Sequence, residues 1–212
     1  MCGDIEPIAL TPAVFSQVRF HRNNRRYRFL LDVCRMVAED LLPSENEGQW
    51  HFVDFTRDEM KMNQLFEKFV FNIYRLETSY KVRVEEIKWT LDSASPEDLA
   101  FLPIMRTDIT LQNSDEKIIM DAKYYRETMS ERYSQKKIKS GNMYQLFSYL
   151  INQETEDPRT LATRGILLYP AVDQDYDLRY RFEGHRLEIR TVNLHADWDK
   201  IDQRLKEIVG IK

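Results

Sequence analysis

The sequence predicts an α/β domain in which a mixed sheet is flanked by helices, with a helical segment at its N-terminal side. Two observations favour this class. Apolar residues recur at helical spacing in the first part of the chain and again near its end, whereas alternating and continuous apolar runs typical of strands fill the middle. The chain has 212 residues and is 42% hydrophobic, which is enough for one sizeable core.

Helices are expected in the N-terminal part of the chain. The apolar pattern over residues 11–42 predicts a helix, a basic turn with the sequence HRNNRR and a second helix. Residues 42–49 combine Pro, Ser, Asn and Gly and predict a loop. A third helix is predicted over 58–77, where acidic residues precede a wide apolar stripe. We therefore expect a helical segment over residues 1–50, packed on a domain that spans 51–212.

Strands are expected in the middle of the chain. Residues 80–90 alternate between apolar and charged side chains, which predicts a half-exposed strand, and DSASPED predicts a loop. Two strands around a short polar turn are predicted over 106–125, followed by a loop rich in Ser, Lys and Gly. The rest is predicted to form a helix over 142–153, strands over 164–171, 176–183 and 186–194, and an amphipathic helix over 197–210.

Composition excludes several classes of protein. No apolar run is long enough to span a bilayer, and the N-terminus lacks the features of a signal peptide, so we expect a cytoplasmic protein without a membrane partner. Two cysteines cannot supply a disulfide framework or a four-thiolate cluster. The histidines lack ligand spacing and no Gly-rich phosphate loop is present, which argues against zinc or nucleotide binding by this chain.

Three charged residues stand in the predicted strands, where Asp and Lys are disfavoured. If Asn113 pairs with Glu116 across the turn, the antiparallel register places Asp108 opposite Asp121, with Cβ atoms about 5 Å apart. Lys123 shares the face of Asp121 because side chains alternate along a strand. We therefore expect one face of this hairpin to belong to the core and the other to carry chemistry.

Two carboxylates at this separation repel by roughly 3 kcal/mol at an effective dielectric near 20, so a cation is expected between them. Mg²⁺ suits the position, because it commonly binds one or two carboxylates together with substrate phosphates. Lys123 would then orient or deprotonate a water, or stabilise charge on a phosphate, which is the chemistry of phosphodiester hydrolysis. The alternative interpretation is a solvated hairpin face, because the same spacing of Asp and Lys also arises by chance.

Two neighbouring helices offer further candidates. Gln145 and Tyr149 are four residues apart and share one helix face, while Leu146 and Leu150 turn toward the core. Glu67 lies at the edge of the apolar stripe in the preceding helix, where it could reach a metal. A solvated helix carboxylate is an equally good interpretation of Glu67.

The motifs MRTDITL, IIMDAKYY, GNMYQLFSYL and RGILLYP together resemble the nuclease domain of the McrC family, within the PD-(D/E)xK superfamily. The resemblance extends to VRFHRNNRRYRFLLDVCRMV and MNQLFEKFV, and so covers nearly the whole chain. It implies a restriction-endonuclease-like fold and Mg²⁺-dependent cleavage of DNA, in complex with McrB, a GTP-hydrolysing AAA+ ring that recognises methylcytosine. McrC chains usually carry a further N-terminal region that engages McrB, so we expect a fragment or a short family member.

Transferred by position, the resemblance makes Asp108 and Asp121 metal ligands and Lys123 the catalytic lysine. Gln145 and Tyr149 match the Q-x3-Y element of the RecB-like branch, and Glu67 matches its helix glutamate as a further metal ligand. Asp121 stands where Glu is commoner, and the family accepts either residue.

Two basic clusters are candidates for DNA contact. The lysine cluster, Lys136, Lys137 and Lys139, leads into the helix of Gln145, so it is our preferred DNA-binding segment. For the arginine cluster over residues 19–28, a subunit interface or a solvated turn is slightly favoured over DNA. The alternative to a nuclease is a non-catalytic adaptor that binds DNA or regulates an NTPase ring. Cutting both strands of DNA would require two sites, so a dimer is possible.

Overall fold

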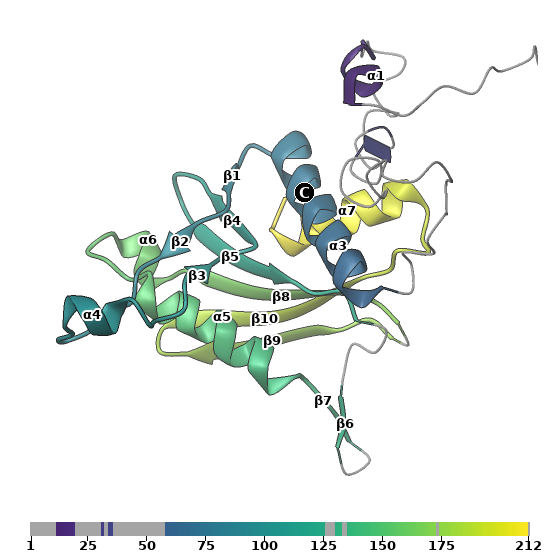
Figure 1. The fold of residues 1–212 in the computed structure, drawn as a ribbon. Helices are drawn as coiled ribbons and strands as arrows, with labels where there is room; N and C mark the ends of the chain where they lie inside the picture. The colour runs from purple at the N-terminus through teal and green to yellow at the C-terminus, as the bar shows by residue number, and fades with distance from the viewer. Residues whose placement is uncertain are drawn as a thin grey trace, which may run out of the picture. The chain divides into compact units, whose positions relative to one another are not determined.

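The computed structural model describes residues 12–19, 31, 34–35, 58–125, 130–132, 135–172 and 174–211 (Figure 1). For residues 12, 130–132 and 135–137 it describes the backbone alone. The chain forms two compact units, Met1–Leu65 and Phe66–Lys212. The predicted boundary after residue 50 stays a prediction, because residues 36–57 lie outside the described part of the chain.

The first unit contains α1, Pro12–Ser16, and helical backbone at Leu31, Cys34 and Arg35. Most of the predicted helical region over 11–42 lies outside the described residues. Helix α3, Glu59–Glu77, begins in the first unit and continues in the second, close to the predicted range of 58–77. Its start is capped by Asp58, whose Oδ1 accepts hydrogen bonds from the backbone N–H groups of residues 60 and 61, each at 3.1 Å.

A six-stranded mixed sheet forms the centre of the second unit, with the order β1-β4-β5-β8-β10-β9. Strands β5, β8 and β10 run parallel to one another, and the other neighbours are antiparallel. The mixed sheet predicted from the sequence is therefore confirmed. The strands are β1 Lys81–Arg83, β4 Ile109–Gln112, β5 Lys117–Ala122, β8 Arg164–Pro170, β9 Asp177–Phe182 and β10 His185–Val192.

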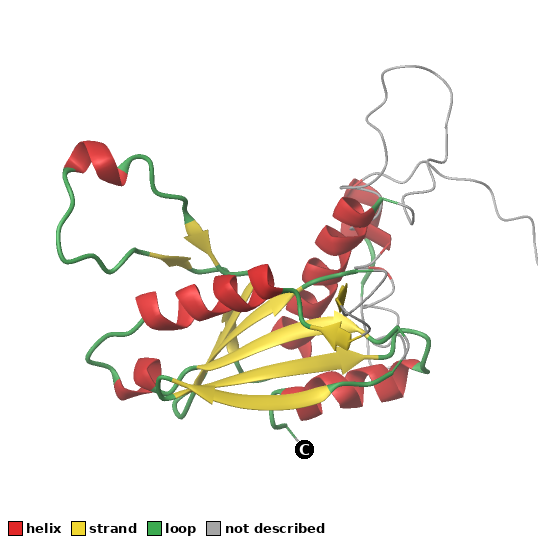
Figure 2. Cartoon of the chain, turned by 90° about the horizontal axis from the view of Figure 1, so that it is seen from below, coloured by secondary structure: helices red, strands yellow, loops and turns green. Residues whose placement is uncertain are grey.

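Helices cover both faces of this sheet (Figures 1 and 2). Helix α5, Ser140–Asn152, lies on one face, above a core that includes Ile119, Leu167 and Ile189. Helix α7, Trp198–Ile208, and the part of α3 from Phe66 onward lie on the other face. The Tyr74 hydroxyl of α3 donates a hydrogen bond to the Leu205 carbonyl of α7 at 2.9 Å. The central strands are buried on both faces, as parallel strands require.

Several elements differ from the prediction. The single strand expected over 80–90 is wrong, because β1 joins the main sheet whereas β2, Glu86–Ile87, pairs with β3, Met105–Arg106. The loop expected in DSASPED contains α4, Pro96–Leu99. The β6–β7 pair, Ser130–Arg132 and Gln135–Lys137, lies in the loop expected after the hairpin, and α6, Pro158–Leu161, lies where no element was predicted. Among the described residues, every helix is too short or too polar to cross a membrane.

Candidate active site

The β4–β5 hairpin sets the geometry of the site, and its register is the predicted one. Asn113 closes the turn: its backbone N–H donates to the Glu116 carbonyl at 3.1 Å, and its Oδ1 accepts the N–H groups of Asp115 and Glu116, each at 2.8 Å. Ile109 pairs with Met120, so Asp108 immediately before β4 is carried toward Asp121 on β5.

Asp108, Asp121 and Lys123 meet at this end of the hairpin. Lys123 Nζ lies 3.2 Å from Asp108 Oδ2 and 2.9 Å from Asp121 Oδ1. Asp108 Oδ2 also accepts a hydrogen bond from the Ala122 backbone N–H at 3.1 Å. The Lys123 backbone N–H donates to the Leu168 carbonyl of β8 at 2.9 Å, which fixes the lysine against the sheet. Two carboxylates and one ammonium group therefore share one small volume.

Asp121 carries the least satisfied charge of this group. Its side chain is 0% exposed, and neither of its carboxylate oxygens receives a hydrogen bond of acceptable geometry, although Lys123 Nζ lies close to one of them. Burial and the neighbouring Asp108 raise the pKa of Asp121 to about 7, against the opposing effect of Lys123. Burial alone would lower the pKa of Lys123, but Asp121 and Asp108 together raise it above its ordinary value.

The prediction that this hairpin has one core face and one chemical face is wrong. Every residue of β5 is buried, and Ile119, on the same face as Asp121, belongs to the core beneath α5. The reason is that β5 is an interior strand, with β8 parallel to it on its far side and helices on both faces. The acidic pair thus lies at the end of a covered face, where the side chain of Asp108 is still 14% exposed.

Gln145 and Tyr149 lie on one face of α5, as predicted, and Leu146 and Leu150 are fully buried. Gln145 Nε2 donates a hydrogen bond to the Tyr149 hydroxyl at 2.7 Å. That hydroxyl donates to the backbone carbonyl of Arg106 at 2.9 Å. Because Arg106 precedes Asp108 by two residues, this chain of hydrogen bonds ties α5 to the segment that presents Asp108.

A polar chain next to the site was not predicted. Asn142 Nδ2 donates to the Tyr169 hydroxyl at 3.0 Å, and the Tyr125 hydroxyl donates to Asn142 Oδ1 at 3.3 Å. Burial raises the pKa of Tyr169 to about 12, with a contribution from the charge of Asp121. Lys139 Nζ lies 3.3 Å from the centre of the Tyr125 ring. The signals that the sequence offered were the position of Tyr125 two residues after Lys123 and that of Asn142 at the start of α5.

Other predicted site residues are less well placed by the structure. Glu67 is half-buried on α3, which covers the face of the sheet opposite to α5. Among the described residues, no three or more His, Cys, Asp or Glu side chains gather closely enough to hold a metal, so Glu67 is not brought together with the pair. Its role as a ligand stays a prediction. The backbones of Lys136 and Lys137 lie in β7, but their side chains lie outside the described part of the chain.

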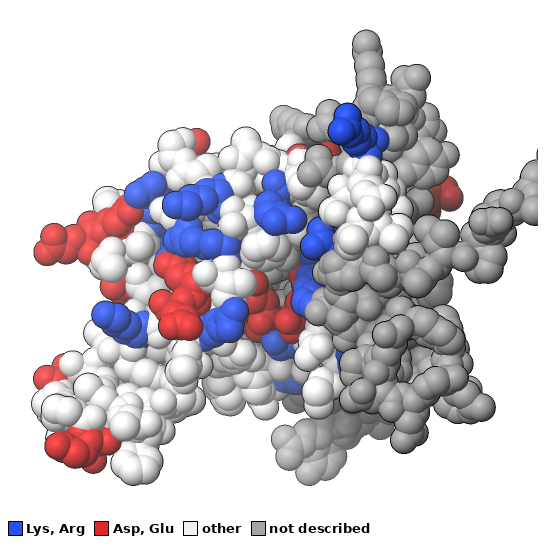
Figure 3. All heavy atoms as spheres, turned by 45° about the horizontal axis from the view of Figure 1, so that its top comes forward, with Lys and Arg blue, Asp and Glu red and all other residues white. Residues whose placement is uncertain are grey.

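Positive and negative side chains are mixed on the described part of the surface. On the face shown in Figure 3, Lys and Arg side chains lie among Asp and Glu side chains. This distribution agrees with the formal net charge of -4, which excludes a uniformly basic coat.

The residues present fit a hard divalent cation. Asp121 offers two buried oxygens that lack hydrogen bonds, and Asp108 offers a second carboxylate close by. A buried carboxylate without hydrogen bonds, which shares its one ammonium partner with a second carboxylate, is costly, and a cation bound by its oxygens lowers that cost. Two carboxylates match the ligand set that Mg²⁺ takes when phosphate and water complete its coordination.

The fold and the site define a mixed α/β protein with a carboxylate–carboxylate–lysine cluster at the end of adjacent strands. Residues 1–170 match the family described as McrBC 5-methylcytosine restriction system component. The chain is also 37% identical over 205 residues to the type IV methyl-directed restriction enzyme EcoKMcrBC of Escherichia coli (strain K12), which covers 96% of this chain and 58% of that protein. The chain therefore belongs to this McrBC family, as the motifs indicated, and spans a little over half the length of its curated relative.

Proposed function

We propose that the chain is the nuclease subunit of a modification-dependent restriction system, and that it hydrolyses DNA phosphodiester bonds with Mg²⁺ at a PD-(D/E)xK site. The observation that carries the proposal is Asp121, a fully buried carboxylate without hydrogen bonds, beside Asp108 and Lys123. Family membership and the name of the Escherichia coli relative support the proposal.

In this proposal Asp108 and Asp121 hold Mg²⁺, which when bound polarises the scissile phosphate and makes a water more acidic. The Lys123 ammonium lies within 3.2 Å of both carboxylates, so it is positioned to orient the attacking water or to stabilise negative charge on the phosphate. Gln145 and Tyr149 keep the segment before Asp108 in place through the Arg106 carbonyl. Glu67 is retained as a candidate ligand.

The DNA in this proposal is contacted by Lys139, together with Lys136 and Lys137 of β7. Lys139 lies over Tyr125, two residues beyond Lys123, and therefore near the cluster. The substrate is DNA that contains 5-methylcytosine, and a McrB-like GTP-hydrolysing AAA+ ring is the partner that selects it. We place this activity in the cytoplasm, and pairing of two such subunits would cut both strands.

The test is a cleavage assay on methylated and unmethylated plasmid with the chain, its McrB-like partner, GTP and Mg²⁺. Asp121→Asn should lower the cleavage rate by about 100-fold or more, because it removes a charged metal ligand. Asp115→Asn, an exposed carboxylate at the turn of the same hairpin, is the matched control and should leave the rate unchanged. Equal rates for the wild type and Asp121→Asn would refute the nuclease assignment. A wild type that stimulates GTP hydrolysis without cutting DNA would establish the adaptor instead.

A further inference from the structure

A segment of the second unit projects from the edge of the fold. We call it the arm: residues 88–104, which leave β2, contain α4 and return through β3. Figures 1 and 2 show α4 held away from the sheet and from the other helices. The hydrogen bonds of α4 and the residues that follow it, from Ser95 to Leu102, are made within the arm.

The arm is unusually apolar for such an exposed element. Phe101 is 88% exposed and Ile104 is 77% exposed. Leu91 and Leu99 are also about half exposed, at 45% and 47%. Single exposed apolar side chains are common on protein surfaces, but several together on one projecting element indicate a surface that another molecule covers.

The stem of the arm is firmly attached. The Trp89 indole N–H donates to the Pro103 carbonyl at 2.8 Å, which joins its two sides. The Thr90 backbone N–H donates to Asn152 Oδ1 at 2.8 Å, which fixes the arm to the end of α5. Ile87 and Met105, at the base, are buried in the core beneath α5. The apolar side chains are thus presented in a fixed arrangement, which lowers the entropy cost of binding.

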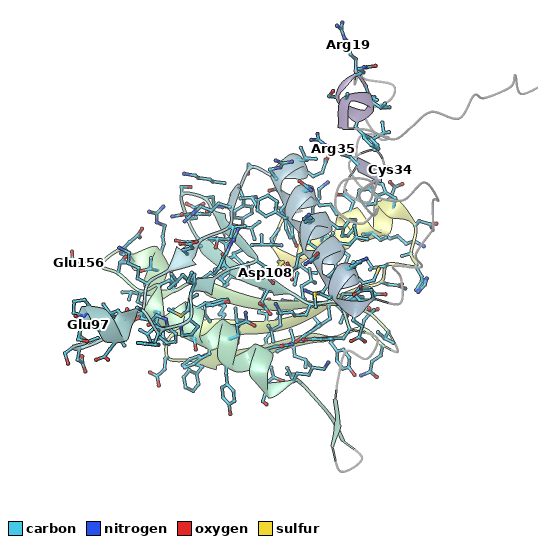
Figure 4. The ribbon with its side chains drawn as sticks, in the orientation of Figure 1. Arg19, Cys34, Arg35, Glu97, Asp108 and Glu156 are labelled. Atoms are coloured by element: carbon cyan, nitrogen blue, oxygen red, sulfur yellow. The ribbon has the colours of Figure 1, made fainter. Side chains whose placement is uncertain are left out.

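Carboxylates surround these apolar groups. The arm carries Asp92, Glu97 and Asp98, against one cation, Lys88 at its base. Among the residues that the structure describes, these three carboxylates form no ion pair. Glu97 stands at the outer end of the arm, well separated from Asp108 in Figure 4.

A cleft of about 560 Å³ opens where the arm meets the body of the unit. Its lining is mostly apolar and includes Trp89, Leu91, Ile151 and Leu161, with the carboxylate of Glu154 among them. A space of this size accepts one or two large apolar side chains from a partner. Leu91 belongs both to the lining of the cleft and to the exposed apolar side chains of the arm, so the two features meet at this residue.

We infer that the arm and the cleft at its base form a docking surface for the GTP-hydrolysing partner, which contributes a basic amphipathic segment. This inference rests on the proposed function. The apolar side chains of that segment enter the cleft and cover Phe101 and Ile104, and its Lys or Arg residues face Glu97 and Asp98. DNA does not suit this surface, because its phosphates would meet carboxylates. A second copy docked symmetrically would bring like charges together.

The arm is directly connected to the segment that presents Asp108 in the candidate active site. Strand β3, Met105–Arg106, returns from the arm and ends two residues before Asp108. The Arg106 carbonyl is held by Tyr149, so the arm and the acidic pair share one structural support. A partner on the arm is therefore positioned to act on the segment that presents Asp108.

The experiment measures binding of the whole chain to the purified McrB-like ring, assembled with a non-hydrolysable GTP analogue, by titration calorimetry. Phe101→Ser with Ile104→Ser should weaken binding about tenfold or more, as loss of apolar anchors does. Glu97→Lys with Asp98→Lys should weaken it similarly and reverse its salt dependence. The matched controls are Val172→Ser, 49% exposed in the wild type, and Glu207→Lys, exposed on α7. Both controls should bind as the wild type does.

All four variants change exposed side chains, so their unfolding temperatures should match that of the wild type. Wild-type affinity in both arm variants would overturn the inference and leave the partner assignment intact. A ring that does not bind the wild-type chain would also overturn it, whereas the nuclease assignment would still be decided by Mg²⁺-dependent cleavage. If Phe101→Ser with Ile104→Ser left the ring affinity unchanged but abolished a dimer of the chain, the occupant would be a second copy. If the same variant left the ring affinity unchanged but weakened DNA binding, the occupant would be DNA.

Discussion

Asp121 Oδ1 and Lys123 Nζ lie 2.9 Å apart at the end of β5, yet neither carboxylate oxygen of Asp121 receives a hydrogen bond of acceptable geometry. Lys123 is shared with Asp108 at 3.2 Å, so one ammonium group faces two carboxylates in a place that water hardly reaches. Such a carboxylate opposes folding unless another cation joins it. The arrangement is costly for structure and useful for binding a metal.

Asp121→Asn is therefore expected to stabilise the metal-free protein while it abolishes cleavage. Asparagine has nearly the same shape, carries no charge to bury and no longer repels Asp108, and Lys123 keeps its contact with Asp108. We expect a gain of about 1 kcal/mol in the free energy of unfolding in EDTA. Urea denaturation measures this gain, and Asp115→Asn at the exposed turn should change it by less than about 0.5 kcal/mol. A clear loss of stability in Asp121→Asn would mean that the carboxylate is well satisfied without metal.

Magnesium is expected to raise the unfolding temperature of the wild type. A ligand that binds only the folded state at 100 times its dissociation constant stabilises that state by about 2.7 kcal/mol. The stabilisation should disappear when EDTA is added, and it should be absent in Asp121→Asn, because that variant loses the buried carboxylate whose oxygens lack hydrogen bonds. Differential scanning fluorimetry gives both results without any cleavage assay. An equal shift in both proteins would place the magnesium elsewhere.

The local geometry of this site could be predicted because short-range rules determine it. Asn113 accepts two backbone N–H groups within the turn, which fixes the register of the hairpin and hence the approach of Asp108 to Asp121. The helical spacing of Gln145 and Tyr149 likewise placed them on one face. Helix α4 was missed although its signals were present: Ser95 caps it, Pro96 opens it and acidic residues follow.

Contacts between distant parts of the chain could not be predicted in the same way. The burial of Asp121 depends on β8 and α5, which follow it in sequence and cover it in space. Likewise, nothing in the local pattern indicates that Lys117 is buried and paired with Glu85, 32 residues earlier. The single strand predicted over 80–90 forms two strands in the structure, because β1 joins the main sheet whereas β2 pairs with β3.

The Lys117–Glu85 pair predicts a specific dependence of stability on pH. Lys117 is 4% exposed, and its Nζ donates to Glu85 Oε1 at 3.1 Å. Burial alone would raise the pKa of Glu85, but Lys117 and Arg83 outweigh it and hold this pKa below its ordinary value of 4.5. A lowered pKa in the folded state means that the pair stabilises the protein above about pH 4.5. That stabilisation is lost as the pH falls through the folded-state pKa.

Glu85→Gln should therefore cost about 3 kcal/mol at pH 7, because it leaves the Lys117 ammonium buried without its counter-charge. The difference between the wild type and this variant should shrink as urea denaturation is repeated from pH 6 down to pH 3. Glu85→Gln with Lys117→Met should recover much of the stability, since methionine buries no charge. A difference that stays constant with pH would show that the charge of Glu85 is not what stabilises the fold.

Tyr149→Phe tests whether the support behind Asp108 matters for catalysis. The lost hydroxyl donates to the Arg106 carbonyl at 2.9 Å and accepts from Gln145 at 2.7 Å, so the variant leaves two polar groups without their partner. We expect a loss of about 1–2 kcal/mol in the free energy of unfolding. The single-turnover cleavage rate should fall by about tenfold, because a small displacement of a metal ligand is costly. DNA affinity, measured by fluorescence anisotropy, should not change.

The matched control is Tyr169→Phe, which removes a hydroxyl bonded to Asn142 on the same side of the sheet but without contact to Arg106. Its stability should fall by about half as much, because Tyr169→Phe loses the one hydrogen bond from Asn142 whereas Tyr149→Phe loses two. Its cleavage rate should fall less than that of Tyr149→Phe, since the segment before Asp108 keeps its anchor. Equal losses of rate in the two variants would mean that general loosening of the core slows cleavage. A selective loss in Tyr149→Phe would instead assign that tyrosine to the positioning of Asp108.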